Sequence, residues 1–398
     1  MRFARPTGRY AVGTVSRHWT DPARPALFDA DPAARRELIV QLWYPARVSP
    51  GAAPAPYVRN APALAPGLAS LAQQNAQRLF PRLRVPVPSA PLRMLGRVRT
   101  HAVARTPVAG DEARYPVLVF LEGLNGLRQM NTFQAEELAS HGYIVAALDQ
   151  PGTAAAVVLP DGRTVLGRTK DQLEAVLQQS IAPSAGVPAL NGHPLPDGIV
   201  PHLAQDAAFC LDRLRALDEA DPTGILTGRI DTDRAGVFGV SLGGIVAAQA
   251  AHRDPRLRAC LVMEAPMPHD VVTDGLRQPT MWIASDADTW RMQRWTDRDI
   301  TQHHSMRAVF EKSPGGGWYL ELPRVFHLNL TDVPLLISQP IGRLLRLLGP
   351  VDARRVHRVV NDYTLAFFDR HLRGLPAALL DETPSRGVRI ESRPPRHG

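Results

Sequence analysis

The sequence contains the stretch Gly239-Val240-Ser241-Leu242-Gly243, which has the pattern G-x-S-x-G. This pattern is typical of a nucleophile elbow, a tight turn that lifts a serine hydroxyl between a strand and a helix. The flanks fit that context, because residues 234–238 form an apolar, strand-like run and residues 245–251 an alanine-rich, helix-forming run. A serine hydroxyl needs a neighbouring base before it becomes a good nucleophile. The stretch therefore predicts Ser241 as a nucleophile and requires a histidine elsewhere in the chain.

The pattern around this turn is regular and predicts the fold. Continuous apolar runs alternate with helix-forming runs, which indicates a mostly parallel sheet with helices on both faces. The expected strands are residues 115–121, 143–149, 234–238, 259–263, 280–285 and 317–322, and the expected helices are residues 133–141, 205–217, 245–251 and 354–372. Gly374 is expected to cap the last helix. We therefore expect an α/β-hydrolase fold in a single domain, residues 1–375.

Two insertions interrupt the expected domain, at about residues 49–90 and 151–200. Both are rich in proline, alanine or glycine, which are typical of loops and turns. The first is expected to hold one short helix at residues 68–79, and the second a hairpin that turns at Asp161-Gly162. Two more strands, residues 37–45 and 97–104, are expected on either side of the first insertion.

The two ends of the chain carry little structural signal. The tail is residues 376–398, of which residues 384–398 are expected to be disordered because they are polar and proline-rich. The start of the chain lacks the apolar segment of a signal peptide, so we expect a cytoplasmic protein, or a secreted one if a leader has been removed. No apolar run reaches the roughly 18 residues that a membrane-spanning helix needs.

Composition excludes several classes of protein. The formal net charge is +8 over 398 residues, and Lys170 and Lys312 are the only lysines. The arginines are scattered, without a basic block or interleaved aromatic residues, so we expect no nucleic-acid partner. Cys210 and Cys260 lie in apolar segments, which is typical of buried thiols rather than of a disulfide or a metal site.

The base and the acid follow the nucleophile in the chain order of this fold. His327 comes just after the last expected strand, where a loop can return it to Ser241 at the carboxyl edge of the sheet. Two positions remain open for the acid. Glu264 ends the strand at residues 259–263, whereas Asp286 and Asp288 follow the strand at residues 280–285. A carboxylate at the end of an apolar strand is costly to bury without a partner, which favours Glu264.

Two backbone N–H groups are expected to hold the developing oxyanion. One belongs to Leu242, which follows the nucleophile, and the other to Leu124, in the loop after the strand at residues 115–121. This chemistry needs neither a metal nor an organic cofactor. His303 and His304 are adjacent, which is not metal-ligand spacing, so no metal site is expected.

Several segments together resemble the plasma and intracellular type II platelet-activating-factor acetylhydrolases, the group VII phospholipases A2. The run His327-Leu328-Asn329-Leu330-Thr331-Asp332 is similar to the family's H-x-N-x-x-D run, whose histidine is catalytic. Residues 138–147, LASHGYIVAA, match another family stretch, and the WYP sequence at residues 43–45 and residues 366–372 also agree. The resemblance covers most of residues 35–375.

The resemblance implies Ser241 as nucleophile, His327 as base, and Leu124 and Leu242 as oxyanion donors. It places the acid where this chain has Glu264 and the family has Asp, so Asp288 and Asp286 are kept as fallback acids. A second departure is the oxyanion loop, where the family's H-G-L-G is Glu122-Gly123-Leu124-Asn125. Glu122 and Asn125 are then expected at the substrate, with Glu122 either pointing away from the oxyanion or binding a polar or cationic substrate group.

The implied function is hydrolysis of short-acyl or lipid carboxylic esters by a serine hydrolase. A general carboxylesterase or a polyester hydrolase of the same fold is the alternative, and a non-catalytic binding protein of this fold is the alternative from another class. Ile341, Leu344, Leu345 and Leu348 share one helical face beside two arginines. This stretch is expected either to contact a membrane surface or gate the pocket, or to pack on the core.

Overall fold

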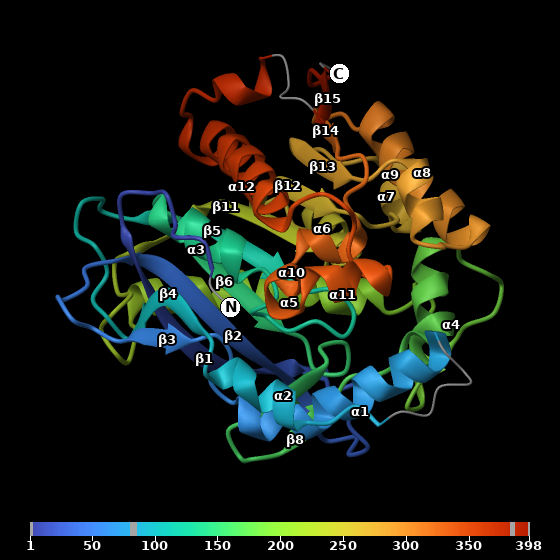
Figure 1. The fold of residues 1–398 in the computed structure, drawn as a ribbon, viewed down its shortest axis with the longest axis horizontal. Coiled ribbons are helices and arrows are strands. Elements are labelled where there is room, and N and C mark those ends of the chain that lie inside the picture. The colour runs from blue at the N-terminus through green and yellow to red at the C-terminus, as the bar shows by residue number, and fades with distance from the viewer. Residues whose placement is uncertain (1–2, 80–85, 383–386, 397–398) are drawn as a thin grey trace.

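The computed structural model describes residues 3–79, 86–382 and 387–396 of the chain (Figure 1). Its centre is an eleven-stranded sheet with the order β15-β14-β13-β12-β11-β5-β6-β2-β1-β4-β3. The strands of this sheet are β1 (Ala11–Pro25), β2 (Arg35–Ala46), β3 (Pro54–Pro56), β4 (Arg99–Ala104), β5 (Tyr115–Leu121), β6 (Ile144–Asp149), β11 (Ile230–Val240), β12 (Leu257–Met263), β13 (Thr280–Ala284), β14 (Gly317–Glu321) and β15 (Arg389–Arg393). Two small hairpins, β7 (Ala156–Val158) with β8 (Thr164–Leu166) and β9 (Ala189–Leu190) with β10 (His193–Pro194), lie outside it.

Six neighbouring strands, β14, β13, β12, β11, β5 and β6, pair in parallel and form the centre of the sheet. The ribbon of β1 and β2 continues the sheet beyond β6 in antiparallel pairing. Because parallel strands run in one direction, the loops that follow β5, β11, β12 and β14 all leave the same edge. That edge brings together the expected oxyanion loop, the elbow, Glu264 and His327.

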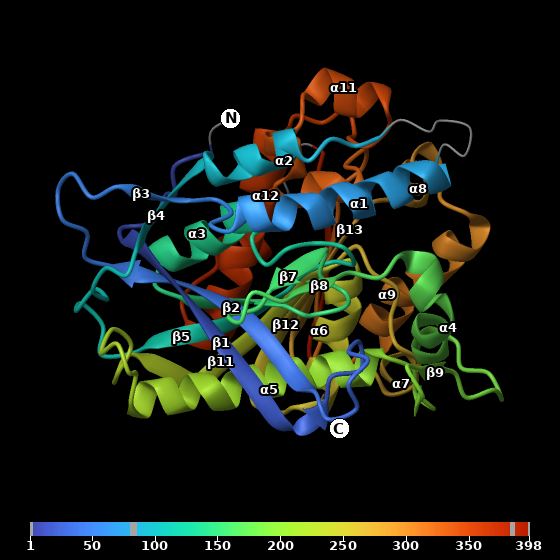
Figure 2. The same cartoon turned by 90° about the horizontal axis from the view of Figure 1, so that it is seen from below.

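Helices cover both faces of the sheet, with α5 and α6 on one face and α3 and α12 on the other (Figures 1 and 2). The helices are α1 (Ala61–Leu79), α2 (Ala90–Arg93), α3 (Thr132–Ser140), α4 (Lys170–Ile181), α5 (Val200–Glu219), α6 (Leu242–Arg253), α7 (His269–Asp274), α8 (Ala287–Met292), α9 (Asp297–Lys312), α10 (Val333–Leu336), α11 (Gln339–Leu344) and α12 (Ala353–Phe368). Short turns of other helix types are η1 (Met94–Gly96), η2 (His327–Leu330), η3 (Asp369–Arg373) and η4 (Ala378–Leu380).

The alternation of β5 side chains explains why its sequence is apolar throughout. Val117 and Val119 pack on the side of α5 and α6, while Leu118 and Phe120 pack on the side of α3 and α12. All seven residues of β5 are buried, as expected for a parallel strand covered on both faces. The predicted mostly parallel sheet with helices on both faces is therefore confirmed.

The elements outside the parallel centre differ more from expectation. The hairpin at Asp161-Gly162 is confirmed, since β7 and β8 pair across it. The helix expected at residues 68–79 starts earlier, at Ala61, and includes Pro66. The cap at Gly374 is confirmed by its left-handed φ of 64°. The sequence pattern missed β1, whose 15 residues mix apolar side chains with arginine, aspartate and proline.

The expectation of a disordered tail is wrong for β15. This strand pairs antiparallel with β14 at the edge of the sheet. Ion pairs join the two strands and α9, from Arg389 to Glu321 and from Glu391 to Arg307. Charged side chains suit an exposed edge strand, and they also hide it from a search for apolar runs. Residues 383–386 and 397–398 of the predicted tail lie outside the described residues.

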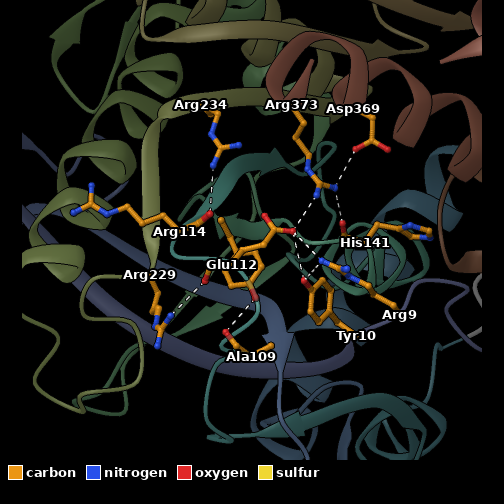
Figure 3. Close-up of polar contacts among 11 residues, drawn as sticks. Arg9, Tyr10, Ala109, Glu112, Arg114, His141, Arg229, Arg234, Asp369 and Arg373 are labelled. Carbon is orange, nitrogen blue, oxygen red and sulfur yellow. Dashed lines mark hydrogen bonds and ion pairs between the residues drawn. The ribbon is translucent and has the colours of Figure 1, made fainter. Parts of the chain in front are cut away.

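A polar cluster around Glu112 holds the opposite edge of the sheet together (Figure 3). The Glu112 Oε1 atom accepts hydrogen bonds from Arg373 Nη2 at 3.0 Å and from Arg9 Nη2 at 3.3 Å. The Glu112 carbonyl accepts a third from Arg229 Nη1 at 3.3 Å. One carboxylate thus joins the N-terminal segment, the entrance to β5 and the turn after α12.

Replacing Glu112 by Gln should destabilise the fold without affecting the edge of the sheet that carries Ser241. The amide loses the charged attraction to the largely buried Arg373 guanidinium group, and a hydrogen bond to a charged group contributes about 1.5–3 kcal/mol. The exposed Arg9 adds little. We expect the free energy of unfolding in urea to fall by about 1–2 kcal/mol. Glu219→Gln, at an exposed carboxylate at the end of α5, is the matched control. An unfolding midpoint equal to that of the parent would show that the cluster is not stabilising.

Candidate active site

Ser241 lies on a sharp turn between β11 and α6, as the pattern predicts. Its backbone has φ 59° and ψ −126°, a conformation that non-glycine residues rarely adopt. The Ser241 N–H donates to the carbonyl of Met263 at 2.9 Å, which ties the turn to the end of β12. The serine side chain is half-buried, so it remains open to a substrate.

The two glycines of the turn are required by close backbone contacts. A Cβ at Gly239 would lie 2.2 Å from the carbonyl oxygen of Gly243. A Cβ at Gly243 would lie 1.9 Å from the carbonyl oxygen of Leu121, the last residue of β5. Only glycine fits such approaches. The turn is therefore pressed against the point where the expected oxyanion loop leaves the sheet.

The expected oxyanion loop passes directly beside Ser241. An ideal Cβ at Gly123 would lie 3.2 Å from Ser241 Cβ and 3.8 Å from its Oγ. The loop is closed by two hydrogen bonds, from Asn125 N–H to the Thr153 carbonyl and from Gly126 N–H to the Gly123 carbonyl, both 2.8 Å. Within the described ranges, the N–H groups of Leu124 and Leu242 donate to no protein acceptor. Both are free to bind a substrate oxygen.

His327 begins the short helical turn η2 after β14. Its N–H donates to Gln293 Oε1 at 2.8 Å, and the edge of its ring meets Trp295 at 5.7 Å between centroids. Burial, together with His303, lowers the pKa of His327 to about 4, so the imidazole is neutral near pH 7 and able to accept a proton. In the part of the chain that the structure describes, His327 Nδ1 is buried and has no hydrogen-bond partner.

Residues 322–332, between β14 and α10, form the loop that carries His327, called the histidine loop below. The other polar residues of the HLNLTD run hold this loop in place. Asn329 Oδ1 accepts from the N–H groups of Phe326 at 3.2 Å and Gly349 at 2.7 Å. The carboxylate of Asp332 is fully buried and accepts from the N–H groups of Thr132 and Phe133 at the start of α3. Because α3 follows the oxyanion loop in the chain, Asp332 joins the histidine loop to that loop.

Glu264 ends β12 and is completely buried. Its Oε1 accepts from Ser285 N–H at 3.0 Å and Trp290 Nε1 at 2.5 Å, and its Oε2 contacts Ser285 Oγ at 3.1 Å. Burial raises the pKa of Glu264 to about 7. No direct hydrogen bond joins Glu264 to His327 among the described residues.

Two contacts connect Glu264 to the histidine loop indirectly. The Ser285 hydroxyl also hydrogen-bonds the carbonyl of Val325, two residues before His327. The ring of Trp290 stacks on Trp295 at 5.8 Å and 3°, and Trp295 is the residue against the histidine ring. Sequence reasoning missed Ser285, Trp290 and Trp295. Their signal is weak, since a serine and two tryptophans after a strand have no motif spacing.

The two fallback acids, Asp286 and Asp288, interact with other parts of the protein. Asp286 Oδ1 accepts from Thr289 N–H at 2.8 Å and caps α8. The side chain of Asp288 is 87% exposed and pairs with Arg291 at 2.9 Å. Neither carboxylate is directed into the buried end of the strand as Glu264 is. Of the three candidates, the geometry favours Glu264.

Glu122 and Asn125 shape the loop from inside. Glu122 is 2% exposed, and its Oε1 accepts from Gln150 N–H at 3.0 Å. Its carboxyl group is thus held at the end of β6, where Gln150 begins the following loop. Asn125 has a left-handed φ of 62°, and its Oδ1 is buried.

Backbone strain gathers at this edge of the sheet. Asn125, Ser241, Glu264 and Arg324 have positive φ, and they follow β5, β11, β12 and β14 respectively. Each such residue costs on the order of 1–3 kcal/mol, so the surrounding structure must hold it in place. Of the eight non-glycine residues with positive φ in the described part of the chain, four thus lie after strands at this edge of the sheet.

Comparisons with known proteins show which proteins the chain resembles. Residues 3–162 and 215–376 match the family described as Platelet-activating factor acetylhydrolase, isoform II. The chain is 21% identical over 273 residues to the platelet-activating factor acetylhydrolase of Gallus gallus, covering 65% of this chain and 62% of that protein. It is 24% identical over 272 residues to that of Bos taurus, covering 65% and 57%. The chain thus spans less than two thirds of the length of these curated relatives.

A solved structure is similar over almost the whole chain. It is the ferulic acid esterase from Streptomyces cinnamoneus, with 28% identity, a TM-score of 0.70, and coverage of 98% of this chain and 99% of that one. This likeness confirms the α/β-hydrolase fold. The segment that the family match omits, residues 163–214, contains α4 and most of the predicted second insertion. The chain belongs to the platelet-activating factor acetylhydrolase isoform II family.

Proposed function

We propose that the protein hydrolyses carboxylic esters with Ser241 as the nucleophile. The observation that carries the proposal is the arrangement at the elbow. Ser241 is held in a strained turn, with Gly123 against it and the N–H groups of Leu124 and Leu242 unoccupied. Donors of this kind stabilise the negative charge that develops on a carbonyl oxygen, and each contributes about 10²–10³ in rate. Membership of the family supports the same chemistry.

The proposed reaction follows the two steps of serine esterases. Ser241 Oγ attacks the acyl carbon while His327 takes the hydroxyl proton, and the carbonyl oxygen becomes the oxyanion. His327 then gives this proton to the alkoxide oxygen as the ester C–O bond breaks, which releases the alcohol. Water, deprotonated by His327, attacks the acyl-enzyme and frees the acid and Ser241. The low pKa of His327 keeps it neutral before each proton transfer.

Glu264 is proposed as the acid that orients His327. Among the described residues, its Oε2 accepts one hydrogen bond, from the Ser285 hydroxyl, which leaves a lone pair for the Nδ1–H of the histidine. Hydrogen bonds between catalytic groups are often long without substrate and tighten in the complex. The additional methylene of Glu, compared with Asp in the family, gives the carboxylate a longer reach from β12.

The substrate class is proposed as short-acyl or lipid esters. Esters of aromatic acids are a second candidate, which two observations favour: the half-buried Trp295 beside His327, and the similarity to a ferulic acid esterase. The two candidates differ in the acyl group that the site must accept. A profile over p-nitrophenyl acetate, butyrate and octanoate, an sn-2-acetyl phospholipid and methyl ferulate separates them.

A lipid substrate would require contact with a lipid surface, for which α11 is the proposed element. Leu344 is 82% exposed and Ile341 56% exposed, while Leu348 is packed on the core. The apolar face that the sequence predicts is therefore divided. Leu348 packs inside the protein, whereas Ile341 and Leu344 are exposed to solvent. The helix projects from the side of the molecule that carries α1 (Figure 2). No helix among the described residues is long and apolar enough to cross a bilayer.

Ser241→Ala should abolish hydrolysis. Loss of a triad serine lowers kcat by roughly 10⁴–10⁶ in serine hydrolases. We expect a loss of this size with p-nitrophenyl acetate, together with loss of covalent labelling by a fluorophosphonate probe. Ser49→Ala, at an exposed serine of the first insertion, should behave like the parent. Undiminished hydrolysis by the Ser241→Ala protein would remove the basis of the proposed function.

Glu264→Gln should lower kcat by about 10²–10⁴, because the amide cannot orient and stabilise the protonated histidine. Burial raises the pKa of Glu264 to about 7, so the active carboxylate form is lost as the pH falls through that value. The parent should therefore lose activity below about pH 7, and the residual activity of the variant should lack this step. Asp288→Asn is the control and should leave kcat unchanged. The reverse pattern would assign the acid to Asp288.

Leu344→Glu should weaken binding to vesicles without changing the hydrolysis of p-nitrophenyl acetate. The exposed leucine would bury apolar area in the lipid, whereas a carboxylate resists transfer from water. Co-sedimentation with phosphatidylcholine vesicles that contain phosphatidylserine measures the effect. Leu375→Glu, at an exposed leucine after α12, is the matched control. Equal sedimentation of the parent and both variants would contradict membrane contact through α11.

A further inference from the structure

Glu122 occupies the base of the oxyanion loop but has no part in the reaction described above. It is the first residue after β5, and Gly123 and Leu124 follow it directly. Its Oε1 accepts from the N–H of Gln150, the first residue after β6, at 3.0 Å. Its Oε2 is buried and has no partner among the described residues. The side chain therefore joins the oxyanion loop to the end of the neighbouring strand by one hydrogen bond.

A buried polar network continues from this bond into the protein. The amide Nε2 of Gln150 donates to Asp206 Oδ2 at 2.8 Å and to the Leu203 carbonyl at 3.0 Å, both on α5. Asp206 in turn pairs with Arg36 of β2 at 2.5 Å and with Arg24 of β1 at 2.8 Å. The oxyanion loop is thus connected, through Glu122 and Gln150, to the β1–β2 ribbon and to α5.

On its other side, Glu122 neighbours Asp149, the last residue of β6. Asp149 accepts a hydrogen bond from the backbone N–H of Arg128 at 2.6 Å. It also forms an ion pair with the guanidinium group of Arg128. Arg128 belongs to the segment between the oxyanion loop and α3. Asp149 therefore has its own cation, as Asp206 has two.

Carboxyl groups outnumber guanidinium groups by one in this network. The carboxyl groups belong to Asp21, Asp149, Asp206 and Glu122, and the guanidinium groups to Arg24, Arg36 and Arg128. Each aspartate pairs with at least one of the arginines, and Glu122 pairs with none of them. A buried carboxylate without a cation is costly, so the additional proton belongs on Glu122.

The titratable groups near Glu122 also favour its protonated form. Burial and the charge of Asp149, with a smaller effect of Asp206, raise the pKa of Glu122 to about 8. Burial also raises the pKa of Asp149, but Arg128 opposes that rise, so Glu122 is the member of the pair that holds the proton. His202 on α5 supplies no compensating charge, because burial and Arg36 lower its pKa to about 4. Glu122 is therefore surrounded by two aspartates whose cations are already engaged, and near pH 7 it carries its proton.

We propose that Glu122, as a neutral carboxylic acid, is a positioning residue that holds the oxyanion loop over Ser241, and that its ionisation disables the loop. The inference rests on the proposed function and concerns the same site. An ionised Glu122 would place an unpaired charge one residue from Gly123, close to the oxyanion that Leu124 must stabilise. Its Oε2 would also require water or a cation, and reaching either one displaces the loop from Ser241.

Two substitutions separate positioning by the neutral acid from a simple need for bulk. Glutamine has the shape of the neutral acid and keeps an oxygen for the N–H of Gln150, but it cannot ionise. Aspartate can ionise but is one methylene too short to reach. Glu122→Gln should therefore retain kcat near pH 7 within about threefold, while Glu122→Asp should lose at least about tenfold.

The decisive measurement is the pH profile of kcat and KM with p-nitrophenyl acetate between pH 6 and 9.5, corrected for spontaneous hydrolysis. In the parent, kcat should fall above about pH 8, approaching a tenfold loss per pH unit. In the Glu122→Gln protein this alkaline decrease should be absent, with KM similar to the parent. An unchanged alkaline decrease, or a loss at pH 7 as large as that of Glu122→Asp, would overturn the proposal.

Two further measurements keep the outcome interpretable. Fluorophosphonate labelling at Ser241 tests the proposed function separately, so a labelled parent with no Glu122-dependent profile would contradict only the present inference. Infrared difference spectroscopy between pH 7 and pH 9 should show a larger loss of the protonated carboxyl band in the parent than in the Glu122→Gln protein, because Glu264 and Glu136, whose pKa values burial raises to about 7, contribute equally in both. Fluorophosphonate labelling of the Glu122→Gln protein checks that the variant is folded. An equal loss in the two proteins would contradict a neutral Glu122.

Discussion

The active edge depends on one close contact between two backbones. The α-carbon of Gly243 sits so near the Leu121 carbonyl that a Cβ there would lie 1.9 Å from its oxygen. This contact is possible because β11 and β5 are paired neighbours in the parallel sheet. It fixes the start of α6 against the end of β5, and it thereby fixes Ser241 relative to Gly123. The strained turn, the free N–H groups and the position of the nucleophile all follow from it.

The sequence predicts those parts of the molecule whose signal is local. The parallel strands are continuous apolar runs because both faces of each are buried, and β5 is an example. Ser241 and the loop from Glu122 to Asn125 are identified by short patterns at strand ends. By contrast, β1 and β15 were missed because their polar residues suit the antiparallel outer strands of the sheet, where apolar runs are not required.

What the sequence could not predict are partnerships between distant residues. Nothing near Glu122 indicates that Gln150 holds its carboxyl group or that Asp206 lies beyond it. The same is true of Glu264, whose carboxylate is held by Ser285 and Trp290. Such partners determine whether a buried carboxyl group acts as an acid, acts as a base or only forms a structural hydrogen bond. The residue type and its place at a strand end therefore identify the site but not the role.

The two glutamates of the site illustrate this difference. Both are buried at the ends of parallel strands on either side of β11, and burial raises the pKa of each. Glu264 receives hydrogen bonds from two N–H donors, Ser285 and Trp290, which stabilise its carboxylate form. Glu122 receives one such bond and faces Asp149, which disfavours its carboxylate form. Hence the partners of Glu264 favour its carboxylate form more than those of Glu122 do, although their burial is similar.

Ser285 connects the carboxyl group of Glu264 to the histidine loop by hydrogen bonds. Its hydroxyl has a single proton but lies within hydrogen-bond distance of two oxygens, Glu264 Oε2 and the Val325 carbonyl. When Glu264 is neutral, it donates to Ser285, which then donates to Val325 and satisfies both bonds. When Glu264 is ionised, Ser285 is drawn to the carboxylate, and the bond to Val325 weakens. Since Val325 precedes His327 by two residues, Ser285 couples the protonation state of the proposed acid to the loop that carries the proposed base.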